Sequence, residues 1–304
     1  MNEALLQKLA KPMLVAAPVI WGSSFVVMKH SLDSFTPFYL LAFRFSAAGV
    51  LLGLFFLRRR RGLDLACWRA GAVSGTLLFL AYATQTFGLK GTTPGKNAFL
   101  TAIYCVVVPF LYWAITRKRP DRYHLAAALL CIAGIGLVSL SGGGNTLSLT
   151  PGDALTLLSG VLFAAHIISV TLYSQGRDIF LFTTLQFLFF GVWSWLCALL
   201  FREPFPAAPA MPALLGMIYL VVLSSCAALL FQNIGQKYTA PSTAAVLLSL
   251  EAPFGVFCSV LMGAEQLNPM MLLGFLLIFI AILCSETKFS FLRRKTSATV
   301  EPLP

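Results

Sequence analysis

The sequence has 304 residues, of which 58% are hydrophobic and only 11% are charged. Soluble globular domains carry about 25% charged residues, so this composition excludes that class of protein. The net charge of +11 comes from short basic clusters between apolar runs, not from one continuous basic face, which argues against a nucleic-acid partner.

Ten apolar runs follow one another along the chain, and most have about the 20 residues that a helix needs to cross a bilayer. They lack the alternation typical of the strands of a membrane β-barrel. The first run follows Lys8 and Lys11 without a small-residue cleavage pattern, so we interpret it as a span and not as a signal peptide. The sequence therefore predicts an all-α polytopic membrane protein with ten transmembrane helices at residues 13–29, 36–57, 69–89, 95–116, 122–140, 152–173, 179–201, 213–236, 241–263 and 269–286.

The loops between these runs differ in their lysine and arginine content. With the N-terminus inside, seventeen of these residues lie on the inner side and four on the outer side. The positive-inside rule then predicts that both termini are cytoplasmic and that the loop 141–152 is external. We expect a multi-pass protein of the cytoplasmic (inner) membrane.

A short run occurs twice, at 85–94 and at 232–241, with a shift of 147 positions. A weaker match at a shift of 142 pairs Arg44 with Gln186. Such internal repeats indicate two copies of one structural unit. The identical pairs of the first match are Gln85 with Gln232, Gly88 with Gly235, Lys90 with Lys237, and Pro94 with Pro241.

The repeat divides the chain into two five-helix units, 13–140 and 151–286, followed by a short basic tail, 287–304. Because five is an odd number, the two units enter the membrane in opposite directions. Inverted repeats are typical of carriers that work by alternating access, with the substrate site near the bilayer midplane where the units meet.

Several motifs resemble those of the drug/metabolite transporter superfamily, specifically its ten-helix EamA-type branch. They are W-G-S-S-F at 21–25, P-F-Y-L-L-A-F-R-F at 37–45, G-K-N-A-F-L-T-A-I-Y at 95–104, and S-L-E-A-P-F-G-V-F at 249–257 with G-A-E-Q-L at 263–267. The resemblance covers nearly the whole chain. It implies that the first four helices of each unit surround a central cavity, that the fifth and tenth lie outside, and that transport is outward.

Two charged residues lie near the middle of predicted spans, Arg44 in the second and Glu251 in the ninth. A charge there costs at least ~2.5–3.5 kcal/mol on insertion scales, so it usually faces a polar cavity or a partner. Two interpretations stay open: a purely structural Arg44–Glu251 ion pair, or direct contact with a substrate or a coupling proton. Burial favours the protonated form of a carboxyl group, so Glu251 is a candidate proton carrier.

Other spans carry polar side chains at helical spacing, which predicts polar faces around one cavity. In the repeat alignment Tyr104 is the counterpart of Glu251. His166 has two interpretations, a hydrogen bond to a neighbouring helix or a proton relay. The predicted cavity-lining or substrate-binding residues are Trp21, Ser24, Arg44, Tyr82, Gln85, Asn97, Thr101, Tyr104, His166, Gln186, Gln232 and Glu251.

The sequence contains no catalytic motif, its three histidines are dispersed, and its seven cysteines form no C-x-x-C pair, so we expect no metal and no cofactor. We predict a secondary transporter, not an enzyme, that exports a small metabolite or drug-like solute and contacts membrane lipid. Proton coupling and a homodimer stay open. The alternatives are a membrane-embedded enzyme, such as an intramembrane transferase, or a carrier of nucleotide- or lipid-linked sugars.

Overall fold

The computed structural model describes residues 3–56, 63–140, 150–264, 266 and 269–287, and all regular structure in these ranges is helical. The basic tail beyond residue 287 and most of the linker between the two units lie outside the described residues. The helical segments are α1 (Glu3–Ser31), α2 (Pro37–Phe56), α3 (Leu65–Lys90), α4 (Pro94–Thr101), α5 (Tyr104–Thr116), α6 (Arg122–Leu140), α7 (Pro151–Tyr173), α8 (Ile179–Leu200), α9 (Met211–Tyr219), the π-helical η2 (Leu220–Ala227), α10 (Ala228–Lys237), α11 (Pro241–Leu248), α12 (Glu251–Leu261) and α13 (Pro269–Thr287).

These segments form the ten spans that the sequence predicts. Eight spans are long and apolar enough to cross a membrane, with α4–α5, α9–η2–α10 and α11–α12 each forming one of them. The helices α6 and α13 contain shorter apolar stretches and complete the ten. Large apolar side chains are exposed on the outer helix faces, for example Phe55 at 83% and Leu200 at 76%, as expected for a surface in contact with lipid.

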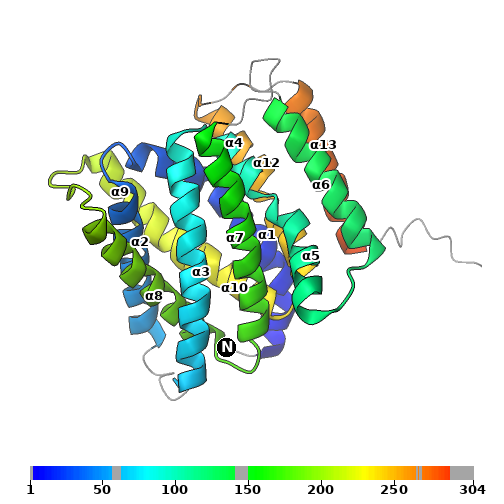
Figure 1. Cartoon of the computed structure of the whole chain (residues 1–304), viewed down its shortest axis with the longest axis horizontal. Helices are drawn as coiled ribbons and strands as arrows, with labels where there is room; N and C mark the ends of the chain where they lie inside the picture. The colour runs from blue at the N-terminus through cyan, green and yellow to red at the C-terminus, as the bar shows by residue number, and fades with distance from the viewer. Residues whose placement is uncertain (1–2, 57–62, 141–149, 265, 267–268, 288–304) are drawn as a thin grey trace, which may run out of the picture.

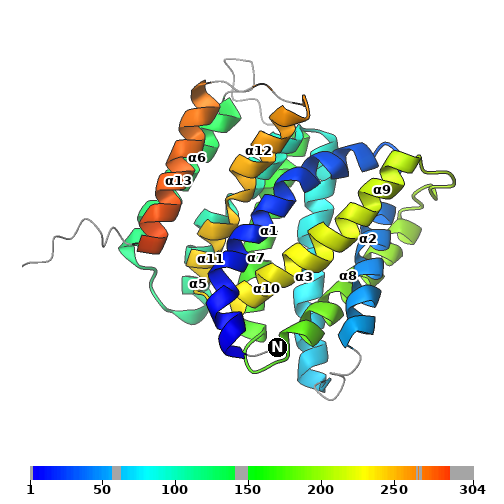
Figure 2. The same cartoon turned by 180° about the vertical axis from the view of Figure 1, so that it is seen from behind.

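Helices of the first half pair with helices of the second half. The main contacts join α3 to α7, α2 to α8, and α1 to α10 and α12. The helices α6 and α13 pack against each other at one edge of the bundle, outside the other eight spans (Figures 1 and 2). This matches the arrangement that the family resemblance implies for the fifth and tenth helices.

The first helices of the two halves run in opposite directions (Figure 1). Near the end of α1, Lys29 Nζ donates hydrogen bonds to the carbonyl oxygens of Leu89 and Thr92. Near the start of α7, Asp153 accepts a hydrogen bond from Thr92 Oγ1, so the end of α1 and the start of α7 lie at the same end of the molecule. The two halves therefore have the inverted arrangement that the odd number of helices in each unit predicts.

Proline opens several helices. It stands at the first position of α4, α7 and α11, where a missing N–H costs nothing because the first turn has no intrahelical acceptor for it. The start of α7 also has a capping box, in which Thr150 and Asp153 each bind the other's backbone N–H.

The structure departs from the sequence prediction in two spans, because residues 95–116 and 241–263 are not continuous helices. The first breaks at residues 102–103, between α4 and α5, and the second at residues 249–250, between α11 and α12. The two breaks are 147 positions apart, the same shift as the sequence repeat. Pro253 accounts for the second break, since it cannot donate to the carbonyl of Ser249 and its ring crowds that carbonyl.

Candidate functional site

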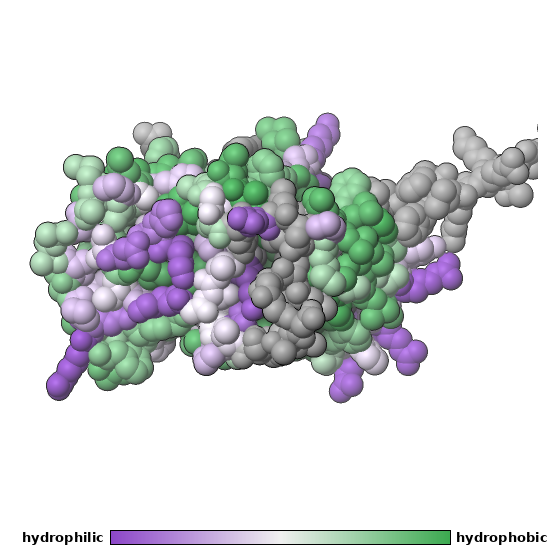
Figure 3. Space-filling model, turned by 90° about the horizontal axis from the view of Figure 1, so that it is seen from above, coloured by the Kyte–Doolittle hydropathy of each residue, from purple (hydrophilic) through white to green (hydrophobic). Residues whose placement is uncertain are grey.

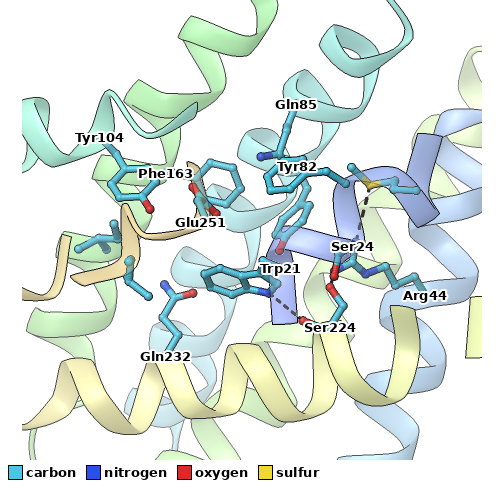
Figure 4. Close-up of a pocket in the computed structure, with 14 residues that line it drawn as sticks. Trp21, Ser24, Arg44, Tyr82, Gln85, Tyr104, Phe163, Ser224, Gln232 and Glu251 are labelled. Carbon is cyan, nitrogen blue, oxygen red and sulfur yellow. Dashed lines mark hydrogen bonds between the residues drawn. The ribbon is translucent and has the colours of Figure 1, made fainter. Parts of the chain in front are cut away.

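A cavity lies at the centre of the bundle, between the two halves (Figure 4). Its walls come from α1, α2, α3, α5, α7, η2, α10, α11 and α12. The lining is mostly aromatic and apolar, with a few polar groups among it. The lining residues are Trp21, Ser24, Phe25, Met28, Arg44, Tyr82, Gln85, Tyr104, Phe163, Ile167, Ser224, Gln232, Leu248 and Glu251.

The cavity is narrow in this structure. The cavity has a volume of about 30 Å³, which is enough for roughly two water molecules. A solute can enter only if the wall side chains or the helices that carry them move apart. The structure is therefore contracted around its candidate site.

Arg44 lies in one wall of the cavity and is 1% exposed. Its guanidinium donates to Ser225 Oγ from Nε at 2.7 Å and to Ser224 Oγ from Nη2 at 2.8 Å. It also lies about 5 Å from the centres of the Phe45 and Tyr82 rings, a distance at which the ring faces attract a cation. These partners are all neutral, so they hold the guanidinium in place without compensating its charge.

The hypothesis of an Arg44–Glu251 ion pair is wrong for this conformation. Figure 4 shows Arg44 and Glu251 on opposite sides of the cavity, with Tyr82 between them. The serine hydroxyls of η2 take the place that the carboxylate would fill in such a pair. Arg44 has no acidic partner within the described part of the chain.

Glu251 and Tyr104 lie together on the other side of the cavity (Figure 4). Each is the first residue of the second half of a broken span, so the two breaks bring equivalent positions of the repeat to one place. Glu251 Oε1 and the Tyr104 hydroxyl are buried and have no hydrogen-bond partner among the described residues. Buried polar groups without partners are costly, so these two atoms are suited to bind a solute, a proton or water.

The structure brings eight of the twelve predicted residues to this cavity. Trp21, Ser24, Arg44, Tyr82, Gln85, Tyr104, Gln232 and Glu251 line it, whereas Asn97, Thr101, His166 and Gln186 do not. Asn97 donates to Thr156 Oγ1, and Thr101 accepts from Gln85 Nε2. These two residues hold helices together beside the cavity, so the prediction that one whole polar face of the span borders the cavity is wrong at both positions.

His166 and Gln186 belong to a separate buried network. The His166 Nε2 and Gln186 Nε2 atoms contact each other, and Asn233 Nδ2 donates to Gln186 Oε1 at 2.7 Å and to Thr183 Oγ1 at 2.9 Å. All four side chains are fully buried between α7, α8 and α10. Of the two interpretations of His166, the structure matches a hydrogen bond between helices.

Ser224 and Ser225 are the polar residues that the sequence prediction missed. They form a polar pair inside an apolar run, and such a pair is a signal that could have identified them. The Trp21 indole donates to the Ser224 carbonyl at 3.0 Å, and Arg44 donates to the Ser224 hydroxyl. Ser224 therefore holds two residues of the cavity wall, one through its backbone and one through its side chain. The apolar lining residues Phe25, Phe163 and Leu248 cannot be told from packing residues by sequence.

No group of three histidine, cysteine or acidic side chains that could hold a metal is present within the described ranges. The cavity offers one cation, one carboxyl group, hydroxyl groups and amides between aromatic rings. Such a set can bind a small, partly apolar molecule through a few directed polar contacts.

Comparison with known proteins gives consistent matches over most of the chain. The model of the EamA-like transporter family matches residues 9–140 and again residues 150–287. An "Uncharacterized transporter" of Archaeoglobus fulgidus is 32% identical over 276 residues, which is 89% of this chain and 83% of the relative. The "Uncharacterized inner membrane transporter YedA" of Escherichia coli K12 is 25% identical over 294 residues, which is 94% of each chain. A solved crystal structure has the same fold, with a TM-score of 0.76 and 19% identity, and the match covers 94% of this chain and 99% of that chain.

Proposed function

Because this chain belongs to the EamA-like transporter family and is a multi-pass membrane transporter, we propose that it carries a small organic anion through its central cavity by alternating access. The solute we propose has a flat apolar body and a carboxylate or sulfonate group. Outward transport rests on the family resemblance.

The observation that carries this proposal is the state of Arg44. A buried guanidinium with only neutral partners lacks a counter-charge, and a charged donor forms the stronger kind of hydrogen bond with an anion. An anionic group of the solute would supply that charge. The rings of Trp21, Phe25 and Tyr82 then form the apolar surface against which the rest of the solute packs.

Polar contacts between the halves support the alternating-access part of the proposal. At one end of the bundle, Asp153 Oδ2 accepts from Lys96 Nζ at 2.8 Å. At the other end, Glu3 lies 3.9 Å from Lys237 Nζ and accepts from the Tyr238 hydroxyl. We propose that these end contacts open in turn, so that the cavity faces one side of the membrane at a time.

Glu251 is the proposed proton site. It is the acidic group in the cavity wall, and its Oε1 atom has no partner among the described residues. If Glu251 bound a proton as the solute left the cavity, the movement of the proton would be coupled to the movement of the solute. The direction of any coupling depends on which side the cavity faces when Glu251 exchanges its proton.

The proposed solute class is tested by protection of a single cysteine from a polar thiol reagent. Gln232→Cys in a background without the seven native cysteines places the thiol in the cavity wall. We expect benzenesulfonate to slow labelling, whereas phenyltrimethylammonium, which has similar size and the opposite charge, should not. Equal protection by both, or by neither, would contradict the proposal of an organic anion.

Metabolite profiling of cells that overproduce or lack the protein gives the natural solute. We expect the accumulated compounds in the lacking strain to be enriched in small carboxylates. An enrichment in sugar nucleotides or lipid-linked sugars would favour the alternative carrier class instead.

A further inference from the structure

A second, larger cavity opens at the end of the bundle that carries the end of α1 and the start of α9. We call it the vestibule, and its volume is about 650 Å³, against about 30 Å³ for the central cavity. Its size suits a small organic molecule. It is lined by Val27, His30, Ser31, Asp33, Ser34, Ala210, Pro212, Ala213, Leu215, Gly216, Tyr219 and Met262.

This end of the molecule differs from the lipid-facing sides. Seen end-on, hydrophilic and intermediate residues lie across the middle of this end, and hydrophobic residues lie along much of the rim (Figure 3). The vestibule itself contains Ser31, Asp33 and Ser34, so it can hold water. It lies at the end of α1 opposite Glu3, which is the outer side in the orientation that the charge distribution predicts.

Tyr219 connects the wall of the vestibule with the wall of the central cavity. Its side chain lines the vestibule, and its hydroxyl donates to the Ile20 carbonyl at 2.9 Å and lies 2.5 Å from Ser23 Oγ. Ser24, which lines the central cavity, donates from Oγ to the same Ile20 carbonyl at 3.0 Å. Tyr219 of α9 and Ser24 of α1 therefore meet at one carbonyl group, so the walls of the two spaces share this point.

The backbone next to Tyr219 is unusual. The π-helical segment η2 begins at Leu220, directly after Tyr219, and continues to Ala227. Segments of this kind are rare, have wider turns than an α-helix and often occur at functional sites. In this chain η2 carries Ser224 and Ser225, the hydroxyl partners of Arg44. A tilt of α9 about η2 would move Tyr219 away from α1 and leave α10, with Gln232, in place.

We propose that the vestibule is the outer end of the solute route and that Tyr219, with Ser23, is the gate between it and the central cavity. The proposal rests on the proposed transport function for its biological meaning. The contact that closes the gate consists of the Tyr219 hydroxyl, the Ser23 hydroxyl and the Ile20 carbonyl. Its opening would expose Ser24, Ser224 and the Arg44 guanidinium to the vestibule.

The gate is tested by the labelling rate of Ser24→Cys in purified full-length protein without native cysteines, reconstituted in liposomes. A membrane-impermeant thiol reagent is added from outside, with liposomes sorted by protein orientation. Tyr219→Phe keeps the ring and removes the hydroxyl. Because a net hydrogen bond is worth about a factor of five in an equilibrium, we expect labelling from the vestibule side to rise about 5-fold.

Three further variants complete the test. Ser23→Ala, which removes the other hydroxyl, should also raise the labelling rate. Tyr173→Phe, on α7 away from the gate and 38% exposed at the tyrosine, should leave it unchanged. The third variant carries both Ser24→Cys and Ser34→Cys. A bulky label attached first at Ser34→Cys should block the later labelling of Ser24→Cys from the vestibule side.

The outcomes separate the gate from the transport proposal, because labelling needs no solute. An unchanged rate in both Tyr219→Phe and Ser23→Ala, in protein that keeps the parent's thermal stability, would overturn the gate. So would labelling of Ser24→Cys that ignores the bulky label at Ser34→Cys. A gate that responds as expected, in protein that binds no benzenesulfonate, would leave the gate in place and contradict the proposed solute class.

Discussion

Positions 44 and 186 are equivalent in the two halves of the chain, but their surroundings differ. Arg44 reaches the central cavity and is held by two serine hydroxyls from the other half. Gln186 points into a packed network with His166 and Asn233 and does not reach the cavity. One copy of the repeat thus places a charge in the cavity wall, and the other uses a neutral amide to join helices. Each of the following changes tests whether the two positions have separate tasks.

The largest effect is expected from Arg44→Gln, which gives the first half the residue of the second. The amide can still bind the serine hydroxyls but has no charge to offer an anion. Since hydrogen bonds to charged groups contribute about 1.5–3 kcal/mol, we expect the benzenesulfonate concentration that protects Gln232→Cys to rise up to roughly 100-fold. Protection assays in liposomes measure this.

The control for Arg44→Gln is Arg122→Gln, at the start of α6 and outside the cavity. It removes the same charge from an exposed position and should leave protection unchanged. If Arg44→Gln also kept full protection, Arg44 would be a structural residue like Gln186, and the contrast between the two halves would fail.

Glu251 and Tyr104 form the second pair of equivalent positions with different chemistry. Glu251→Gln keeps the shape of the side chain but cannot release a proton. We expect it to retain exchange of benzenesulfonate across the liposome membrane and to lose the acceleration that an imposed pH gradient gives the parent protein. Tyr104→Phe, the matched change in the first half, should keep the response to the gradient.

Benzenesulfonate is an anion at all relevant pH values, so a pH gradient does not drive it across the lipid by itself. Parent-like behaviour of Glu251→Gln at every imposed gradient would remove Glu251 from the coupling. Loss of exchange in both Glu251→Gln and Tyr104→Phe would indicate that the pair binds the solute and does not handle a proton.

The network around Gln186 is expected to affect stability and not binding. Asn233→Leu removes the donor to Gln186 Oε1 and leaves that buried oxygen unpaired, which costs about 1–3 kcal/mol of unfolding free energy. We expect a lower thermal midpoint in detergent with unchanged protection by benzenesulfonate. Gln175→Leu, at an exposed position after α7, serves as the control. Loss of protection in Asn233→Leu would connect the network to the solute site.

Much of this fold could be predicted from the sequence, because long apolar runs indicate membrane spans and clustered basic residues indicate their orientation. Arg44 and Glu251 could be identified as candidate site residues, because a charge within an apolar span is costly and usually faces a cavity or a partner. Pro253 indicates a kink at the second helix break, at residues 249–250, because proline lacks the N–H that an interior helix position donates. The break at residues 102–103 was missed, since the apolar run continues through it and position 106, the equivalent of 253, is not a proline.

Partners across the bundle could not be predicted either. Periodicity places Asn97, Thr101 and Tyr104 on one helix face, but the helix break and the neighbouring α7 decide which of them reach the cavity. Thr101 is turned to Gln85, whereas Tyr104 starts the next helix beside Glu251. A pattern in one helix carries no information about which other helix covers it, and this is why the ion pair of Arg44 and Glu251 was a plausible but wrong choice.

The smallest effect is expected from Ser225→Ala, which tests how the second half supports the charge in the first. Arg44 loses the partner of Nε but keeps its charge and the bond from Nη2 to Ser224 Oγ at 2.8 Å. The loss of about one net hydrogen bond should weaken benzenesulfonate protection roughly 5-fold, well below the effect of Arg44→Gln. Ser194→Ala is the matched control, since the Ser194 hydroxyl is buried and, among the described residues, bonds to the Phe190 carbonyl of its own helix. Equal losses in Ser225→Ala and Arg44→Gln would mean that the position of the guanidinium matters as much as its charge. No loss in Ser225→Ala would mean that Ser224 and the rings of Phe45 and Tyr82 suffice to hold it.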